Sequence, residues 1–149
     1  MNSPNKKIIQ LEKASQNAGE SVVLCHGYFN IIHPGHIRYL DYSRQQGSKL
    51  VVSIQGDASF INYERKQHFS EVDRASGVAS IQTVDQVVLL GEGNLEKLIK
   101  VLNPAVLVLG KEFEYESNTL KELLSYKESI NKKEKEQKDI HDILAIEVK

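Results

Sequence analysis

Short apolar runs alternate along the chain with longer stretches in which apolar residues recur every three or four positions. The runs are rich in valine, leucine and isoleucine, which is typical of strands buried on both faces of a sheet. They predict strands at residues 21–25, 49–54, 85–90, 105–109 and 143–148. Because each strand is separated from the next by enough chain for a crossover, we expect a parallel sheet.

Helical spacing occupies the segments before and between these runs. Proline, serine and asparagine stand where helices would begin, and glycine or Asn-Pro stands where they would end. The predicted helices span residues 8–17, 34–46, 70–83, 94–102 and 118–126. With right-handed crossovers, this order predicts a single α/β domain with a Rossmann-like, doubly wound parallel sheet of about five strands.

Composition narrows the class of protein. The chain of 149 residues is 40% hydrophobic and 26% charged, with a formal net charge of −1. This balance offers no basic field for nucleic acid, and no segment approaches the ~20 apolar residues of a membrane helix. Cys25, the single cysteine, lies inside an apolar run and is expected to be a small buried hydrophobe. These features predict a cytoplasmic protein without nucleic-acid or membrane partners.

The residues best suited to binding or catalysis are concentrated in "HGYFNIIHPGH", residues 26–36, just after the strand predicted at 21–25. Ligands of doubly wound sheets bind at the carboxyl ends of strands. Gly27 and Gly35 allow close backbone approach, or positive φ, and a helix amino terminus attracts phosphate. His33 and His36 are three residues apart, so they share one face of that turn and can donate to phosphate oxygens. Neither a Walker loop nor a G-x-G-x-x-G fingerprint is present.

The stretch "GYFNIIHPGHIRYL" closely resembles the G-x-F-D-x-x-H-x-G-H motif of the nucleotidyltransferase superfamily, especially its cytidylyltransferase-like branch. That branch includes glycerol-3-phosphate cytidylyltransferase and the heptose-1-phosphate adenylyltransferase domain. The similarity continues through "LVVSIQGDASF", "VDRASGVASIQTVDQVVLL" and "LNPAVLVLGKEFE". It covers residues 21–113 of a domain that we take to span residues 1–149.

The resemblance implies that an acceptor phosphate attacks the α-phosphate of CTP or ATP, with Mg²⁺ present, and that pyrophosphate leaves. The acceptor would be a phosphorylated small molecule such as a sugar or polyol phosphate, and a homodimer is a common state among relatives. The implied catalytic residues are His33, His36 and Lys66. The implied nucleotide-binding residues are Gly27, Tyr28, Phe29, Gly35, Gly110, Lys111 and Glu112. The implied acceptor-binding residues are Asn30, Asp57 and Arg74, and no protein metal ligand is implied.

The chain departs from the family pattern in three places. Asn30 replaces an aspartate, Glu112 replaces another, and a carboxy-terminal Ser/Thr-rich I-S-T-T-type stretch has no match. The chain is therefore either a domain of a longer polypeptide or a protein with an incomplete site. The alternative function is a catalytically impaired nucleotide-binding module with a regulatory or assembly role. A fragment of a class I aminoacyl-tRNA synthetase is disfavoured by the short chain and the absent K-M-S-K-S-like loop.

Several side chains have a second interpretation. His26 is either a hydrogen-bonding residue at a strand end or a ligand, and Lys66 is either a phosphate ligand or a solvated loop lysine. Arg74 could pair with Glu71 or Asp73 at the start of its helix instead of binding substrate. The remaining histidines, His68 and His141, have no clustered partners in the sequence, which predicts no zinc site.

Overall fold

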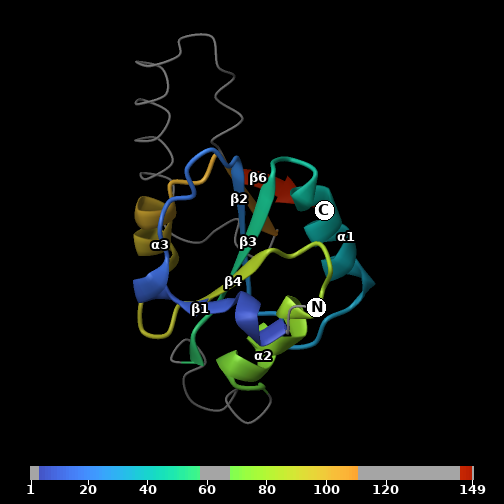
Figure 1. Cartoon of the computed structure of the whole chain (residues 1–149). Coiled ribbons are helices and arrows are strands. Elements are labelled where there is room, and N and C mark those ends of the chain that lie inside the picture. The colour runs from blue at the N-terminus through green and yellow to red at the C-terminus, as the bar shows by residue number, and fades with distance from the viewer. Residues whose placement is uncertain (1–3, 58–67, 111–144, 149) are drawn as a thin grey trace.

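A computed structural model of the chain describes residues 4–57, 68–110 and 145–148. Six strands form one sheet in the order β1-β4-β3-β2-β5-β6, and every neighbouring pair is parallel (Figure 1). The strands are β1 (Ile8–Gln10), β2 (Val22–Gly27), β3 (Lys49–Ile54), β4 (Gln86–Leu89), β5 (Val106–Gly110) and β6 (Ala145–Val148). The helices are α1 (Pro34–Arg44), α2 (Glu71–Ala79) and α3 (Leu95–Leu102).

The chain winds in two directions from β2. It passes through α1 to β3 and through α2 to β4, and then returns through α3 to β5 on the other side of β2. Figure 1 shows α3 on the opposite side of the sheet from α1 and α2. The predicted doubly wound α/β fold is therefore confirmed, and its topological switch point lies at the carboxyl ends of β2 and β5.

Side chains that alternate along β2 enter two separate cores. Leu24 packs among the apolar residues that α3 covers, including Leu98. Val23 and Cys25 pack on the other face, under α1 and α2, with Leu40. Cys25 is fully buried, as expected of a small hydrophobe, and this burial raises the pKa of its thiol to about 12.

The predicted element boundaries are close to the observed ones because capping residues set them. The Ser70 hydroxyl accepts a hydrogen bond from the Asp73 amide at the start of α2. The Asn94 side chain accepts one from the Lys97 amide at the start of α3, and Asn103, with φ 49°, ends that helix. The helix predicted at 118–126 lies outside the described residues.

The helix predicted at residues 8–17 is wrong. Ile8–Gln10 forms β1, which pairs with β4 through the Ile8↔Val87 register, and short 3₁₀ turns flank it at Pro4–Lys7 and Leu11–Lys13. Two successive β-branched isoleucines favour extended backbone, and pairing at a sheet edge satisfies their amides. The sheet therefore has one strand more than the five that the sequence predicts.

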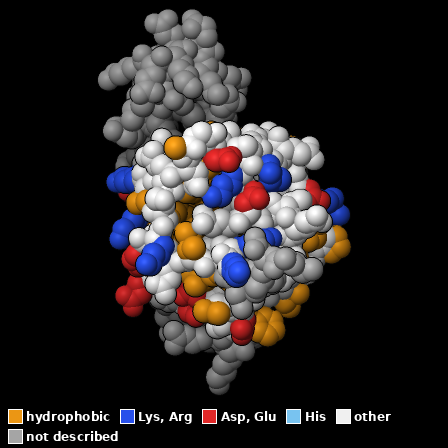
Figure 2. All heavy atoms as spheres, viewed as in Figure 1, with side chains coloured by type: hydrophobic (Ala, Val, Ile, Leu, Met, Phe, Trp, Pro, Cys, Tyr) orange, Lys and Arg blue, Asp and Glu red, His pale blue; other side chains and the backbone are white. Residues whose placement is uncertain are grey.

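No helix among residues 4–57, 68–110 and 145–148 is long and apolar enough to cross a bilayer. On the face shown in Figure 2, lysine and arginine side chains are interspersed with aspartate and glutamate. That face consequently carries no continuous patch of one sign.

A buried polar network joins the carboxyl ends of β2 and β3. His26 Nε2 lies 2.6 Å from Gln55 Oε1, and His26 Nδ1 lies 2.7 Å from Ser53 Oγ. Because an amide oxygen only accepts, Nε2 carries the ring proton and Nδ1 accepts from the hydroxyl. Burial lowers the pKa of His26 from 6.5 to about 4, although the hydrogen bonds oppose this change. Of its two interpretations, His26 fits the hydrogen-bonding strand-end residue.

The lowered pKa of His26 predicts a pH-dependent stability. As the pH falls from 6.5 toward 4, the unfolded chain takes up a proton that the folded chain does not bind. Well above pH 6.5, His26 should therefore leave the free energy of unfolding unaffected. Between about pH 7.5 and about pH 5, this group alone should lower the free energy of unfolding by about 2 kcal/mol. Urea denaturation at the two pH values, compared with the same pair of measurements on His26→Gln, isolates the contribution. An identical pH dependence in the two proteins would contradict it.

Candidate active site

Two imidazoles satisfy the first backbone amides of α1. Pro34, at the first helical position, has no N–H group, so the backbone amides that need an acceptor are those of the residues on either side of it. His33 Nδ1 accepts from the Gly35 amide at 3.0 Å, and His36 Nδ1 accepts from the His33 amide at 3.2 Å. The two rings stack with centroids 3.9 Å apart. The turn is therefore held by reciprocal side-chain caps.

This capping fixes the tautomer of both rings. A neutral imidazole whose Nδ1 accepts a hydrogen bond carries its proton on Nε2. His33 and His36 therefore both offer an Nε2–H donor at a helix amino terminus, where the backbone also favours negative charge. His33 is exposed and His36 is half-buried. Their position at the switch point and their paired donors suit the oxygens of a phosphate chain.

The two glycines of the motif are required for space. A Cβ on Gly35 would lie 2.7 Å from His33 Cε1, and a Cβ on Gly27 would lie 2.6 Å from Phe29 Cε2. Neither glycine has a positive φ, so the positive-φ interpretation of Gly27 is wrong. Any larger residue at these positions would displace a ring that the turn depends on.

Phe29 supports the histidine turn from the core side. Its backbone has φ 50°, a conformation that costs a non-glycine residue about 1–3 kcal/mol. The centroid of its ring lies 5.1 Å from that of the His36 ring. It lies 6.5 Å from that of the Tyr39 ring, on which the Phe29 ring stacks. The Tyr39 hydroxyl in turn donates to the Val108 carbonyl in β5. The packing therefore links His36 through two aromatic rings to a central strand.

Arg74 and Asp57 form an ion pair beside the motif. Arg74 Nη2 lies 2.9 Å from Asp57 Oδ1, and the Arg74 side chain is fully buried while that of Asp57 is 45% exposed. The guanidinium also donates to the Tyr28 carbonyl within the motif. The carboxylate that the structure shows on Arg74 is that of Asp57, whereas the helix-start interpretation named Glu71 or Asp73.

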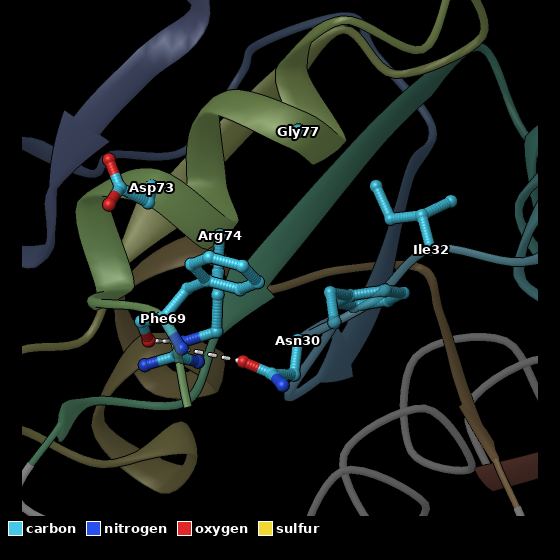
Figure 3. A pocket seen from close by; sticks show the side chains of 7 residues that line it. Asn30, Ile32, Phe69, Asp73, Arg74 and Gly77 are labelled. Atoms are coloured by element: carbon cyan, nitrogen blue, oxygen red, sulfur yellow. Dashed lines mark hydrogen bonds between the residues drawn. The ribbon is translucent and has the colours of Figure 1, made fainter. Parts of the chain in front are cut away.

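A hollow of about 340 Å³ lies between the motif loop and α2. Its lining consists of Phe29, Asn30, Ile32, Phe69, Asp73, Arg74 and Gly77. Figure 3 shows Asn30 and Phe69 joined by a hydrogen bond, in which Asn30 Oδ1 accepts from the Phe69 amide at 2.7 Å. The structure thus brings two of the predicted acceptor-binding residues, Asn30 and Arg74, to one cavity.

Some residues of this region have no counterpart in the sequence-based prediction. Ile32 and Gly77 line the hollow, and Arg38 brings a guanidinium nitrogen to 3.9 Å from the Cβ position on Gly35. A signal for Arg38 was available, because it follows Gly35 by three residues and therefore lies on the same face of the helix. No comparable signal marks Ile32 or Gly77, since their approach depends on the packing of α2 against the motif loop.

The remaining predicted residues are at the sheet edge or outside the described residues. Gly110 ends β5 beside β6, at the same carboxyl edge as the histidine turn. Lys66, Lys111 and Glu112 lie outside the described residues, and their roles stay predictions. Within residues 4–57, 68–110 and 145–148, no three histidine, cysteine or acidic side chains lie close enough together to hold a metal ion.

Comparisons with known proteins agree with this geometry. The sequence profile of the cytidylyltransferase-like family matches residues 24–148. The bifunctional protein HldE of Aliarcobacter butzleri is 35% identical over 118 residues, which cover 76% of this chain and 25% of that protein. HldE of Helicobacter pylori strain J99 is 36% identical over 118 residues, or 76% of this chain and 26% of that protein. The chain thus spans about a quarter of the length of these curated relatives.

A solved structure shows the same likeness over nearly its whole length. The crystal structure of a lipopolysaccharide core biosynthesis protein from Thermoplasma volcanium superposes with a TM-score of 0.65 at 27% sequence identity. The superposition covers 88% of this chain and 98% of that one. Because the family profile also extends from within β2 to the end of β6, this chain belongs to the cytidylyltransferase-like family of nucleotidyltransferases.

Proposed function

We propose that this chain transfers the nucleoside monophosphate of ATP or CTP to the phosphate of a sugar or polyol phosphate and releases pyrophosphate. The observation that supports it most directly is the pair of capping imidazoles at the switch point, each with its proton on Nε2. The similarity to a lipopolysaccharide core biosynthesis protein favours a sugar phosphate, because such cores are built of sugars.

In this reaction an oxygen of the acceptor phosphate forms a bond to the α-phosphorus of the nucleotide. The bond from that phosphorus to the oxygen bridging the α- and β-phosphates breaks, and its electron pair leaves with pyrophosphate. Negative charge grows on the oxygens around the α-phosphorus and on the leaving group. The Nε2–H groups of His33 and His36, with the amino terminus of α1, would stabilise that charge without rearranging. Lys66 is a predicted additional cation.

Mg²⁺ fits this site as a companion of the triphosphate. The described residues offer no cage of three or more ligating side chains, and Mg²⁺ commonly binds through substrate phosphates and water with few protein ligands. It would neutralise part of the phosphate charge when bound. The contribution of the chain itself is to bind and orient the phosphates through the histidine turn.

The hollow beside α2 suits the uncharged part of the acceptor. Three of its walls are the apolar side chains of Phe29, Ile32 and Phe69. Its one described cation, Arg74, already faces a carboxylate and two carbonyl oxygens. An apolar wall beside an amide and a carboxylate favours a carbon skeleton carrying hydroxyl groups over a second phosphate.

A nucleotide-binding module without catalysis is the second candidate. It is favoured by Asn30, which stands where the family motif has an aspartate and therefore carries no charge. Both candidates require the same phosphate site, so they differ in turnover and not in nucleotide binding.

Nucleotide binding is tested by thermal denaturation with Mg²⁺ and each of ATP, CTP, GTP and UTP. We expect ATP or CTP to stabilise the native chain by about 2.7 kcal/mol at a hundredfold excess over Kd, and His36→Ala to abolish the effect. Tyr42→Ala, on an exposed position of the same helix, is the matched control. If no nucleotide stabilises the native chain, the proposed phosphate site is wrong.

Turnover is tested with the stabilising nucleotide by measuring pyrophosphate release over a panel of sugar and polyol phosphates. We expect release with at least one acceptor, and a rate about 10²–10³ lower for His36→Ala, because one donor to the developing charge is lost. Nucleotide binding without release for any acceptor would instead favour the non-catalytic module.

Gly35→Ala should disable the histidine turn while leaving its imidazoles present. The new Cβ would collide with His33 Cε1, so the ring should leave its cap. We expect a loss of about 1 kcal/mol of stability and at least a tenfold rise in nucleotide Kd, measured by urea denaturation and calorimetry. Pro34→Ala, one residue away and exposed, keeps both caps and is the control. Equal affinities for Gly35→Ala and the native chain would contradict the proposed role of the turn.

Gly77→Leu should fill the hollow from α2. A Cβ at this position already lies 3.2 Å from Ile32 Cδ1, and a longer side chain would occupy the space in front of it. We expect the acceptor KM to rise at least tenfold while nucleotide Kd changes less than about twofold, measured with the active acceptor. Ser76→Leu, on the same helix but outside the lining, is the control. An unchanged acceptor KM would exclude the hollow as the acceptor site.

A further inference from the structure

Arg74 belongs to α2, but its guanidinium is shared among three other segments. Nε donates to the Phe69 carbonyl at 2.8 Å, just before α2. Nη1 donates to the Tyr28 carbonyl at 3.0 Å, in the motif loop. Nη2 donates to Asp57 Oδ1 at 2.9 Å, three residues after β3. One side chain therefore joins the strand-end segments that follow β2 and β3 to the start of α2.

Burial makes this arrangement specific. The Arg74 side chain has no exposed surface, and a buried charge is tolerated only when it is paired and hydrogen-bonded. The planar guanidinium can present donors in three directions at fixed angles, which a lysine ammonium cannot reproduce. The three acceptors and the cation therefore hold one another in place.

The contact with Tyr28 acts at a strained point. The Tyr28 carbonyl belongs to the peptide group that precedes Phe29, and Phe29 has φ 50°. Such a conformation persists only where its surroundings over-determine it. Here Arg74 holds the peptide on one side, and the His36 and Tyr39 rings hold the Phe29 ring on the other.

Phe69 is held from two sides as well. Its carbonyl accepts from Arg74, and its amide donates to Asn30 Oδ1 at 2.7 Å (Figure 3). Asn30 directly follows Phe29 in the motif, so a second tie joins the same loop to the start of α2. Loss of Arg74 or of its carboxylate partner should therefore loosen the loop at the Tyr28–Phe29 peptide.

We propose that Arg74, anchored by Asp57, is a positioning residue that fixes the Tyr28–Phe29 peptide and, through the Phe29 ring, the His36 imidazole. The inference rests on the proposed nucleotidyl transfer for its kinetic consequence but not for its structural one. It differs from the acceptor-binding role that the family resemblance implies for Arg74 and Asp57. In this arrangement the ion pair acts by holding a histidine that contacts the nucleotide phosphates, so its loss lowers kcat and weakens nucleotide binding while acceptor binding is affected less.

The structural consequence is tested without any activity. Histidine ring resonances of the ligand-free full chain are compared by NMR in the native protein, Arg74→Lys, Asp57→Ala and Asp57→Asn. We expect Arg74→Lys and Asp57→Ala to shift the His36 resonances, because the ring current of Phe29 moves, and to leave those of buried His26 unchanged. Asp57→Asn keeps an oxygen acceptor and should remain near the native spectrum. An unmoved His36 signal in all folded variants overturns the proposal.

The kinetic consequence is tested with the same variants. We expect kcat to fall at least tenfold in Arg74→Lys and Asp57→Ala, with acceptor KM within about threefold of native, and Asp57→Asn to recover most of the rate. The double variant Arg74→Lys/Asp57→Ala should be no slower than the worse single variant. A rise in acceptor KM with kcat unchanged would instead assign Arg74 to acceptor binding and overturn the proposal.

Arg44→Lys is the matched control. Arg44 also pairs with a carboxylate, that of Asp85 at 3.2 Å, and donates to a carbonyl, that of Gly47. These groups lie at the amino ends of β3 and β4, away from the histidine turn. Arg44→Lys should leave kcat and the His36 signal unchanged, and a kcat loss equal to that of Arg74→Lys would contradict a local effect. If Arg74→Lys does not fold, the two Asp57 variants decide the outcome by the same readings. If the native chain shows no turnover, the proposed function fails while the NMR comparison still decides this inference.

Discussion

The carboxyl edge of this sheet depends on how the first turn of α1 satisfies its backbone amides. Helices most often use a short oxygen-bearing side chain for this purpose, and its oxygen accepts the amide hydrogen bond. Here imidazoles accept the amide hydrogen bonds through Nδ1, which places the proton of each neutral ring on Nε2. The same two residues therefore begin a helix and present its chemistry. Gly35 is part of this solution because its missing Cβ leaves room for the His33 ring.

The strands and the histidine turn could be predicted because their signals are local. Buried parallel strands are continuous apolar runs, and His33 and His36 share a face through their spacing alone. β1 could not be predicted, because three residues are too few to show a period and their pairing partner, β4, lies more than seventy positions away. The partners of Arg74 were equally hidden. Asp57 and Tyr28 both reach Arg74 only because the crossover through α1 places the ends of β2 and β3 side by side.

The replacement of the family aspartate by Asn30 takes on a definite meaning in this setting. An amide oxygen accepts from the Phe69 amide as a carboxylate oxygen would, so the loop keeps its tie to α2. What changes is the charge beside a hollow that already includes Asp73. The departure from the motif thus concerns the electrostatics of the site, while the hydrogen bond that shapes the loop is retained.

The edge strand β1 also bears on where this domain begins. The family profile starts at residue 24, inside β2, yet the sheet is completed by Ile8–Gln10 on the outer edge of β4, and Leu11 is buried in the core under α3. A recombinant fragment cut at the profile boundary would lack Val22 and Val23, the first two residues of a central strand. Even one that began at Val22 would leave the backbone amides and carbonyls of β4 open to pairing with another molecule. The segment before the recognisable motif therefore covers the edge of β4 with a strand of three residues, which presents fewer unpaired backbone groups than β4 would.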